Sequence, residues 1–250
     1  MKSETIYIYG KHALVEALTN APHAVKKVHL SPQLNDKELL NLVAKTKVNT
    51  AVLKDGGVGP GMDRGAVHQG VIGVVAIDAL MRPYKEFFDG LKVTPNTSLV
   101  LLGEVQDPQN VGAVIRSAAA FGVAGVLIPT HNQAQVSGAV VKVSAGMAFR
   151  IPLISIGNVN TVVRDLKDRG FWIYGLDASG EHTVTDESFE EPTVLILGNE
   201  ARGMRAETRK SCDVLLSIPM HPQCESLNAA ASAAVVLYSW SAKHQGALTN

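Results

Sequence analysis

The 250-residue chain has only two cysteines, Cys212 and Cys224, which are too few for a disulfide framework. His221 lies close to Cys224, but this group offers three ligands in an unusual spacing where structural zinc needs four, so we expect no metal. The chain also lacks an uninterrupted apolar run of about 18 residues, so we expect no membrane span. The fold must therefore rest on an ordinary hydrophobic core.

Charged and aromatic residues are also few. Lysine and arginine (23) balance aspartate and glutamate (23), so any RNA binding has to come from a local patch rather than from net charge. Apolar residues make up 46% and aromatic residues 5%, which is typical of a soluble α/β protein. The start, MKSETIYIYGKHALVEAL, is polar where a secretory signal has its apolar centre. We expect a cytoplasmic protein, with an organellar one as the weaker alternative.

The spacing of apolar residues predicts two domains. Residues 1–80 alternate short strands and helices and predict a small α/β/α unit, which includes a glycine-rich loop at 54–70. Residues 81–95 indicate a linker with one or two helical turns. In residues 96–250, near-continuous apolar strands alternate with helices, which is typical of a parallel sheet covered on both faces. The predicted fold class is therefore α/β with a parallel sheet in the second domain.

The stretch GEVQDPQNVGAVIRSAAAFG follows an apolar strand and opens a helix, with Asn110 expected at its N-cap. Arg116 falls off the apolar face and should lean over Gly112 toward the carboxyl end of strand 99–102, where open α/β sheets bind ligands. Capping alone is an alternative explanation for Asn110, and a solvated charge for Arg116. The residues expected to pack on the sheet are Val111, Val114, Ile115, Ala118 and Gly122.

A second polar cluster lies in residues 195–213. A buried strand breaks at Gly198 into Asn199, Glu200 and a glycine-bearing turn, where glycine permits a positive φ and close approach of a ligand. An acid that merely stabilises a helix N-terminus is the structural alternative for Glu200.

A third cluster lies in residues 217–240. Ser226 is placed to cap a long alanine-rich helix, with Asn228 in its first turn. Capping support is the structural alternative for Asn228. Alanines at this density let another helix approach closely, which suits a tight crossing or a subunit interface.

Together, these stretches resemble the SpoU (TrmH-like) branch of the SPOUT methyltransferases, which transfer a methyl group from S-adenosylmethionine to a ribose 2′-hydroxyl of RNA. DPQNVGAVIRSA is similar to the first motif, LILGNEARGM to the second and SIPMHPQCESLNAAASAA to the third, in the same order. IYGKHALVEAL and HQGV resemble the L30e-like substrate-binding extension of members that modify large-subunit ribosomal RNA.

The resemblance implies a knotted (trefoil) C-terminal domain and a homodimer with cofactor pockets close to the subunit interface. It also puts glycine where this chain has Ala201. If that position needs a positive φ, alanine would cost on the order of 1 kcal/mol.

The resemblance also implies site residues by position. Those expected around the acceptor ribose and its phosphate are Asn110, Arg116, Glu200, Ser226 and Asn228. Those expected to bind S-adenosylmethionine are Leu197, Gly198, Asn199, Gly203, Ile218, Met220, Leu227 and Asn228. The candidate RNA contacts of the first domain are Lys11, His12, Arg64, His68 and Gln69. A guanidinium rarely gives up its proton, so we expect Arg116 to grip a phosphate rather than act as a base.

The expected activity is methylation of the 2′-hydroxyl of a guanosine ribose in large-subunit (23S-type) ribosomal RNA. Three alternatives stay open: a transfer-RNA ribose methyltransferase, a non-catalytic RNA-binding or ribosome-assembly protein on the same fold, and a dinucleotide-binding fold. The last is the weakest, because no G-x-G-x-x-G follows a strand.

Overall fold

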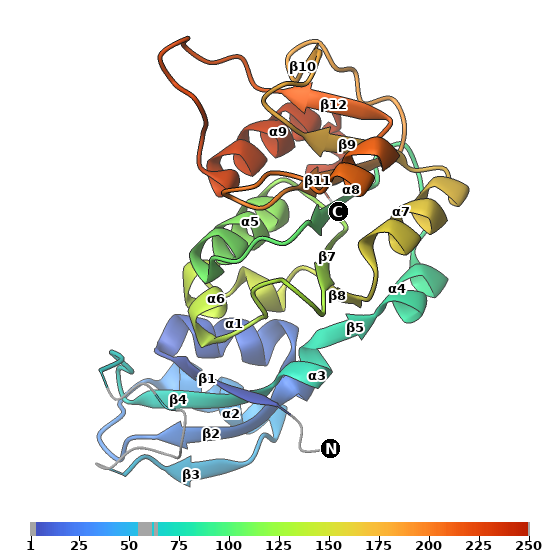
Figure 1. Ribbon diagram of the computed structural model, residues 1–250. Coiled ribbons are helices and arrows are strands. Elements are labelled where there is room, and N and C mark those ends of the chain that lie inside the picture. The colour runs from blue at the N-terminus through green and yellow to red at the C-terminus, as the bar shows by residue number, and fades with distance from the viewer. Residues whose placement is uncertain (1–3, 55–61, 63–64, 250) are drawn as a thin grey trace. The chain divides into compact units, whose positions relative to one another are not determined.

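The computed structural model describes residues 4–54, 62 and 65–249 and forms two compact units (Figure 1). The first unit comprises Met1–Met81 and Val136–Arg150, and the second comprises Arg82–Gln135 and Ile151–Asn250. Within the described ranges, no helix has both the length and the apolar character that a membrane crossing requires.

The first unit is a four-stranded sheet in the order β1-β4-β2-β3, combined with helices. Its elements are β1 (Thr5–Tyr9), α1 (Lys11–Asn20), η1 (Pro22–Ala24), β2 (Val25–Leu30), α2 (Lys37–Thr46), β3 (Thr50–Val52), β4 (Val71–Ala76) and α3 (Ile77–Leu80). Strands β1 and β2 pair antiparallel with β4, whereas β3 pairs parallel with β2. Helix α2 begins where the Asp36 carboxylate accepts a hydrogen bond from the Leu39 amide.

Two further elements of the first unit come from the second half of the chain, namely α6 (Gly138–Val143) and η2 (Met147–Phe149). Arg150 forms a two-point ion pair with Glu16 of α1, with Nε–Oε2 at 2.6 Å and Nη2–Oε1 at 2.8 Å. A Cβ on Gly138 would lie 2.6 Å from the Tyr7 carbonyl, so only glycine fits there. The sequence pattern assigns this segment to the second domain, since local periodicity does not reveal such distant partners.

The second unit is built on an eight-stranded sheet in the order β10-β12-β9-β11-β6-β7-β8-β5. Its elements are β5 (Met81–Pro83), α4 (Tyr84–Gly90), β6 (Ser98–Leu102), α5 (Pro108–Ala120), β7 (Gly125–Pro129), β8 (Leu153–Ile156), α7 (Val159–Asp168), β9 (Trp172–Leu176), β10 (His182–Thr183), β11 (Thr193–Leu197), α8 (Ala206–Ser211), β12 (Val214–Ser217), α9 (Ala229–Lys243) and η3 (Gln245–Leu248). Every neighbouring pair from β10 to β8 is parallel, which confirms the predicted α/β class. The trefoil knot stays a prediction.

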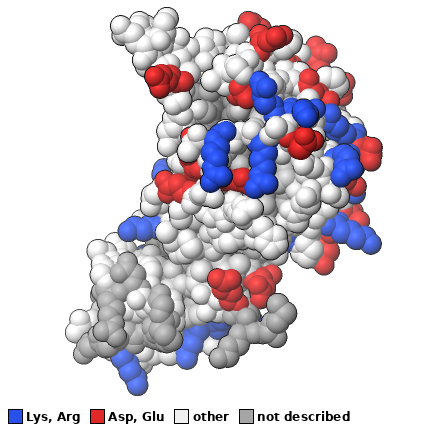
Figure 2. All heavy atoms as spheres, viewed as in Figure 1, with Lys and Arg blue, Asp and Glu red and all other residues white. Residues whose placement is uncertain are grey.

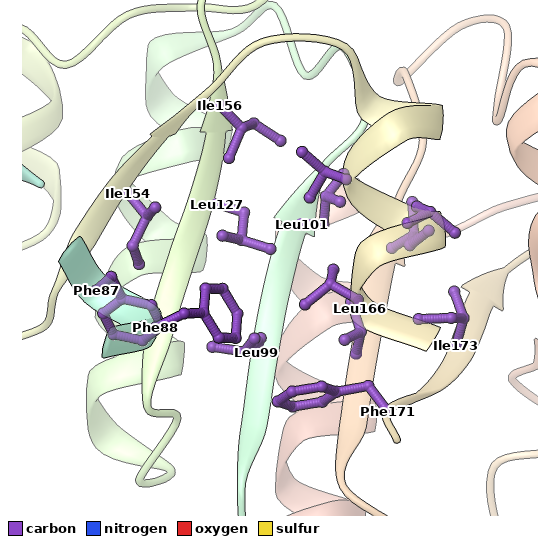
Figure 3. Packing of buried hydrophobic residues seen from close by; sticks show 14 residues of the cluster. Phe87, Phe88, Leu99, Leu101, Leu127, Ile154, Ile156, Leu166, Phe171 and Ile173 are labelled. Carbon is purple, nitrogen blue, oxygen red and sulfur yellow. The ribbon is translucent and has the colours of Figure 1, made fainter. Parts of the chain in front are cut away.

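The core of the second unit lies between the central strands and helices α4 and α7 (Figure 3). Phe88 meets Phe87 and Phe171 edge-on, with ring centroids 5.2 Å and 6.2 Å apart. Both Phe87 and Phe88 are buried. Residues 81–95, which the sequence indicates as a linker, thus contribute a strand and a core-forming helix to this unit.

Candidate active site

The three polar clusters follow strands that lie near one another in the sheet. The order β12-β9-β11-β6 contains parallel strands throughout, so their carboxyl ends meet at one edge. The loop after β6 opens α5, the loop after β11 carries Asn199 and Glu200, and the loop after β12 runs to α9 (Figure 1). Open α/β sheets bind ligands at this edge.

Helix α5 begins differently from the prediction. Asp107 is the N-cap, with its carboxylate 2.8 Å from the Gln109 amide, and Pro108 takes the first helical position. Asn110 is therefore not the N-cap but a buried residue of the first turn. Its side-chain amide is free of capping and can form distant contacts.

Helix α9 also begins differently. Asn228, not Ser226, caps it, because the Asn228 Oδ1 accepts hydrogen bonds from the amides of Ala230 and Ala231 at 2.9 Å and 3.2 Å. The Asn228 side chain still has its Nδ2 to donate, and this atom lies 2.8 Å from Asn110 Oδ1. One side chain thus begins α9 and joins it to α5.

Glu200 completes a group of three, which we name the Asn–Glu–Asn cluster (Asn110, Glu200 and Asn228). Asn110 Nδ2 donates to Glu200 Oε1 at 3.0 Å, while Asn110 Oδ1 accepts from Asn228. The backbone amides of Gln106 and Asp107 each donate to the same carboxylate at 3.2 Å. Residues that lie 90 and 118 positions apart in the sequence are therefore held in one hydrogen-bonded chain.

These donors keep Glu200 ionised. Partial burial on its own would raise the pKa of the Glu200 carboxyl, but the Asn110 amide and the backbone amides of Gln106 and Asp107 stabilise the charged form. The net result is a pKa below the ordinary value. At neutral pH the cluster therefore contains a carboxylate that only accepts hydrogen bonds.

The turn that carries Glu200 is closed by Asn199. Backbone hydrogen bonds of 2.9 Å join Asn199 and Gly203 in both directions, and Asn199 Oδ1 accepts from the amides of Ala201 and Arg202 at 3.0 Å. Gly203 has φ +66°, whereas Ala201 is not among the residues with positive φ. Alanine at position 201 therefore causes no backbone strain in this turn.

A cavity of about 370 Å³ opens at the same edge, which is within the roughly 300–1,000 Å³ typical of small-molecule sites. Seven of the eight residues expected to bind the cofactor line this cavity. The eighth, Asn228, does not line it, although the next residue, Ala229, does. Ser226 and Glu200 also line it. The seven are Leu197, Gly198, Asn199, Gly203, Ile218, Met220 and Leu227.

Arg116 lies apart from these groups. The predicted packing face of α5 is confirmed, since Val111, Val114, Ile115 and Ala118 are fully buried. Arg116 is exposed and does not line the cavity, and its side chain has no hydrogen bond or ion pair with any other described residue. Within residues 4–54, 62 and 65–249, this guanidinium is therefore unpaired.

The first unit brings together part of the predicted RNA-contacting set. The Lys11 amide donates to Gln69 Oε1 at 3.3 Å, and Lys11 Nζ pairs with Asp36 at 2.9 Å. His68 accepts a hydrogen bond from the Gly70 amide, and His12 is exposed. Arg64 lies outside the described residues.

Sequence reasoning missed Asp177, which lines the cavity directly after β9. Strand β9 lies between β11 and β12, so any residue that follows it falls between the second and third motifs. An acid immediately after an apolar strand, as in WIYGLD, was the available signal. The strand order was what the sequence could not show.

Many α/β enzymes bind small ligands at the carboxyl edge of a parallel sheet, in a cavity lined by a few polar groups. The cavity and the hydrogen-bonded Asn–Glu–Asn cluster are typical of this class of protein. Residues 97–238 match the SpoU rRNA Methylase family, and residues 7–79 match RNA 2′-O ribose methyltransferase substrate binding. The chain therefore belongs to the SpoU rRNA methylase family.

Similar proteins cover nearly the whole chain. The 23S rRNA (guanosine-2′-O-)-methyltransferase RlmB of Nitrosomonas europaea is 33% identical over 95% of this chain and 92% of its own length. RlmB of Escherichia coli K12 is 34% identical over 92% of this chain and 96% of its own length. The crystal structure of the SpoU methyltransferase AviRb from Streptomyces viridochromogenes is 25% identical with a TM-score of 0.81, and it covers 98% of this chain and 92% of that one.

Proposed function

We propose that this protein methylates the 2′-hydroxyl of a guanosine ribose in large-subunit ribosomal RNA, with S-adenosylmethionine as the methyl donor. The relatives named as 23S rRNA (guanosine-2′-O-)-methyltransferases support the substrate, because the alignment spans more than nine-tenths of both chains. The observation that carries the proposal is the Asn–Glu–Asn cluster beside the cavity, since it joins all three family motifs.

The cavity suits the proposed donor. S-adenosylmethionine supplies an electrophilic methyl group on a sulfonium centre, and AviRb has been crystallised in complex with it. Leu197 and Leu216, which line the cavity from β11 and β12, offer an apolar surface for an aromatic base, and Ser226 adds a hydroxyl to the lining. The residues that we assign to this ligand are the eight predicted from the sequence, with Asn228 acting from outside the lining.

The chain's own side chains would act by position and charge. Aligning an attacking oxygen with a reacting carbon can lower a barrier by roughly 7–11 kcal/mol. We assign this alignment to Asn110, Glu200, Ser226 and Asn228. Hydrogen bonds already hold three of them, Asn110, Glu200 and Asn228, in position. We assign to Arg116 the grip on the neighbouring phosphate and the stabilisation of charge that develops on the ribose oxygen.

A homodimer is part of the proposal. Helix α9 exposes Val235 and Tyr238, with exposed fractions of 39% and 63%, and Tyr238 contacts Phe121 at 5.9 Å between ring centroids. Exposed apolar surface of this kind marks interaction sites. A second copy that covers α9 would place a subunit interface beside the loop that lines the cavity.

RNA binding is assigned to the first unit through Lys11, His12, Arg64, His68 and Gln69, since residues 7–79 match the substrate-binding family. On the face of the second unit drawn in Figure 2, Lys and Arg side chains are interleaved with Asp and Glu. The ion pairs of the second unit include Arg205–Glu104 and Arg209–Asp177.

Transfer of a labelled methyl group from S-adenosylmethionine to purified RNA tests the proposal. We expect label in large-subunit ribosomal RNA, recovered as 2′-O-methylguanosine that resists alkaline cleavage. Label in transfer RNA alone would instead establish the transfer-RNA alternative. If the protein binds RNA but calorimetry shows no uptake of S-adenosylhomocysteine, the non-catalytic alternative replaces the proposal.

A further inference from the structure

Asp177 lies at the carboxyl edge of the sheet, where the cavity opens. Strand β9 pairs with β11 on one side and with β12 on the other, and Asp177 is the first residue after it. The Asp177 amide donates to the Leu216 carbonyl of β12 at 3.0 Å. Asp177 therefore lines the cavity between the two loops that carry the second and third motifs.

The turn after β9 is rigid. The Gly180 amide donates to the Asp177 carbonyl at 3.0 Å, which closes a tight turn. A Cβ on Gly180 would lie 2.5 Å from the Leu215 carbonyl, so this glycine allows the turn to lie directly on β12. A side chain on such a turn is held in place before any ligand arrives.

The Asp177 carboxylate has a defined number of acceptor positions left. Oδ1 accepts from the Ser179 amide at 2.9 Å and from the Ser179 hydroxyl at 2.6 Å, and Oδ2 accepts from Arg209 Nε at 2.9 Å. A carboxylate offers about four lone-pair sites, so about one remains, on Oδ2. Only 22% of the side chain is exposed, which limits competition from water.

The charge around Asp177 indicates which donor suits that position. Burial on its own would raise the pKa of this carboxyl, but hydrogen bonds from Ser179 and Arg209 hold the pKa below its ordinary value, so the group is ionised. The Arg209 guanidinium already balances its charge, which weakens attraction for a further cation such as an ammonium group. A neutral hydroxyl gains a charge-assisted hydrogen bond without needing a free charge.

We propose that Asp177 accepts a hydrogen bond from one hydroxyl of the nucleoside ribose of the methyl donor, and so sets the specificity of the cavity for a ribonucleoside. This assignment rests on the proposed function. Acids at the carboxyl end of a strand bind ribose hydroxyls in dinucleotide-binding folds, which shows that the chemistry is suitable. Asp177 likewise follows the carboxyl end of a parallel strand, β9, although no glycine-rich phosphate loop accompanies it.

Calorimetry with S-adenosylhomocysteine and with its 2′-deoxy and 3′-deoxy analogues tests the assignment. We expect one of the two deoxy analogues to bind the native chain about 10-fold to 100-fold more weakly, since hydrogen bonds to charged groups contribute about 1.5–3 kcal/mol. Asp177→Asn should weaken the binding of S-adenosylhomocysteine by a similar factor. It should also abolish the difference in affinity between S-adenosylhomocysteine and the weaker deoxy analogue. Asp168→Asn, an exposed acid at the end of α7, should change neither value.

Arg209→Ala separates the hydrogen bond from a general loosening of the turn. It removes the ion pair but keeps the carboxylate, so the penalty for the deoxy analogue should persist. A penalty that persists in Asp177→Asn as well would overturn the assignment. So would an Asp177→Asn variant that loses affinity for S-adenosylhomocysteine but not for 5′-methylthioadenosine, because Asp177 would then bind the amino-acid part. If the native chain does not bind S-adenosylhomocysteine, the proposed function fails first.

Discussion

Helix α5 carries two polar side chains with opposite environments, one buried and hydrogen-bonded, the other exposed. Asn110, in the first turn, is buried and hydrogen-bonded to Glu200 and Asn228. Arg116, six residues further on, is exposed and has no ion pair with the described part of the chain. The first is complete within one subunit, whereas the second is available to a phosphate or to a second copy. We propose that Asn110 is held in position before the substrate binds, whereas Arg116 finds its partner only in the phosphate of bound RNA.

The largest effect that this comparison predicts is on Arg116. Arg116→Ala should lower the single-turnover methylation rate about 100-fold to 1,000-fold, the usual loss when one stabilising donor is removed. The temperature of unfolding should not change, because the Arg116 side chain has no ion pair or hydrogen bond to lose within the described part of the chain. Rapid-quench assays with RNA, together with thermal unfolding, measure both quantities.

Arg116→Lys sharpens the same prediction, because lysine keeps the charge but not the two-point grip on phosphate. We expect this variant to remain well below the native rate. A near-native rate would show that charge alone is sufficient, and a fully active Arg116→Ala would remove Arg116 from the site. Arg164→Ala, at an exposed position on α7, is the matched control.

The next effect concerns the exposed face of α9. Tyr238→Glu should raise the dissociation constant of the dimer about 30-fold, because an aromatic anchor at an interface contributes about 2 kcal/mol or more. Sedimentation over a range of concentrations measures it. A native chain that sediments as a monomer at high concentration would disprove the dimer, and a Tyr238→Glu dimer of native strength would place the interface elsewhere.

The Asn–Glu–Asn cluster should respond through stability. Glu200→Gln keeps one acceptor oxygen but puts an amide group where the carboxylate had its second oxygen, so at least one of the Asn110, Gln106 and Asp107 amides loses its acceptor. Because Glu200 is exposed, we expect a loss of about 1 kcal/mol of unfolding free energy. Because the pKa of Glu200 is lowered in the folded chain, its stabilisation is present above its ordinary value of 4.5 and is lost as the pH falls through the folded-state pKa. The difference in unfolding free energy between native and variant chains should therefore shrink on acidification. Denaturant titrations from pH 7 to pH 3 that give a constant difference would contradict this.

The smallest effect belongs to the first unit. Lys11→Ala should weaken RNA binding nearly equally for all sequences and reduce the slope of log affinity against log salt by about 1, as expected for one lost phosphate contact. Fluorescence anisotropy between 50 and 200 mM salt measures the slope. Lys45→Ala, at an exposed position on α2, is the matched control, and an unchanged slope for Lys11→Ala would remove Lys11 from the RNA surface.

Local chemistry explains which parts of this fold could be predicted. Apolar periodicity gave the parallel sheet and the buried face of α5, because both depend on residues close in sequence. The caps were assigned to the wrong residues, since Asp107 competes with Asn110, and Asn228 with Ser226, for similar roles at positions two or three residues apart. Asp177 was missed because its importance depends on β9 lying between β11 and β12.

Mapping ribose methylation in large-subunit RNA shows whether this protein modifies a guanosine ribose and whether Arg116 is needed. RNA would be taken from cells that carry the native chain, the Arg116→Ala chain, or neither. The account predicts one methylated guanosine ribose that is present with the native chain, absent without it, and absent or strongly reduced with Arg116→Ala. Identical maps from all three kinds of cell would contradict it.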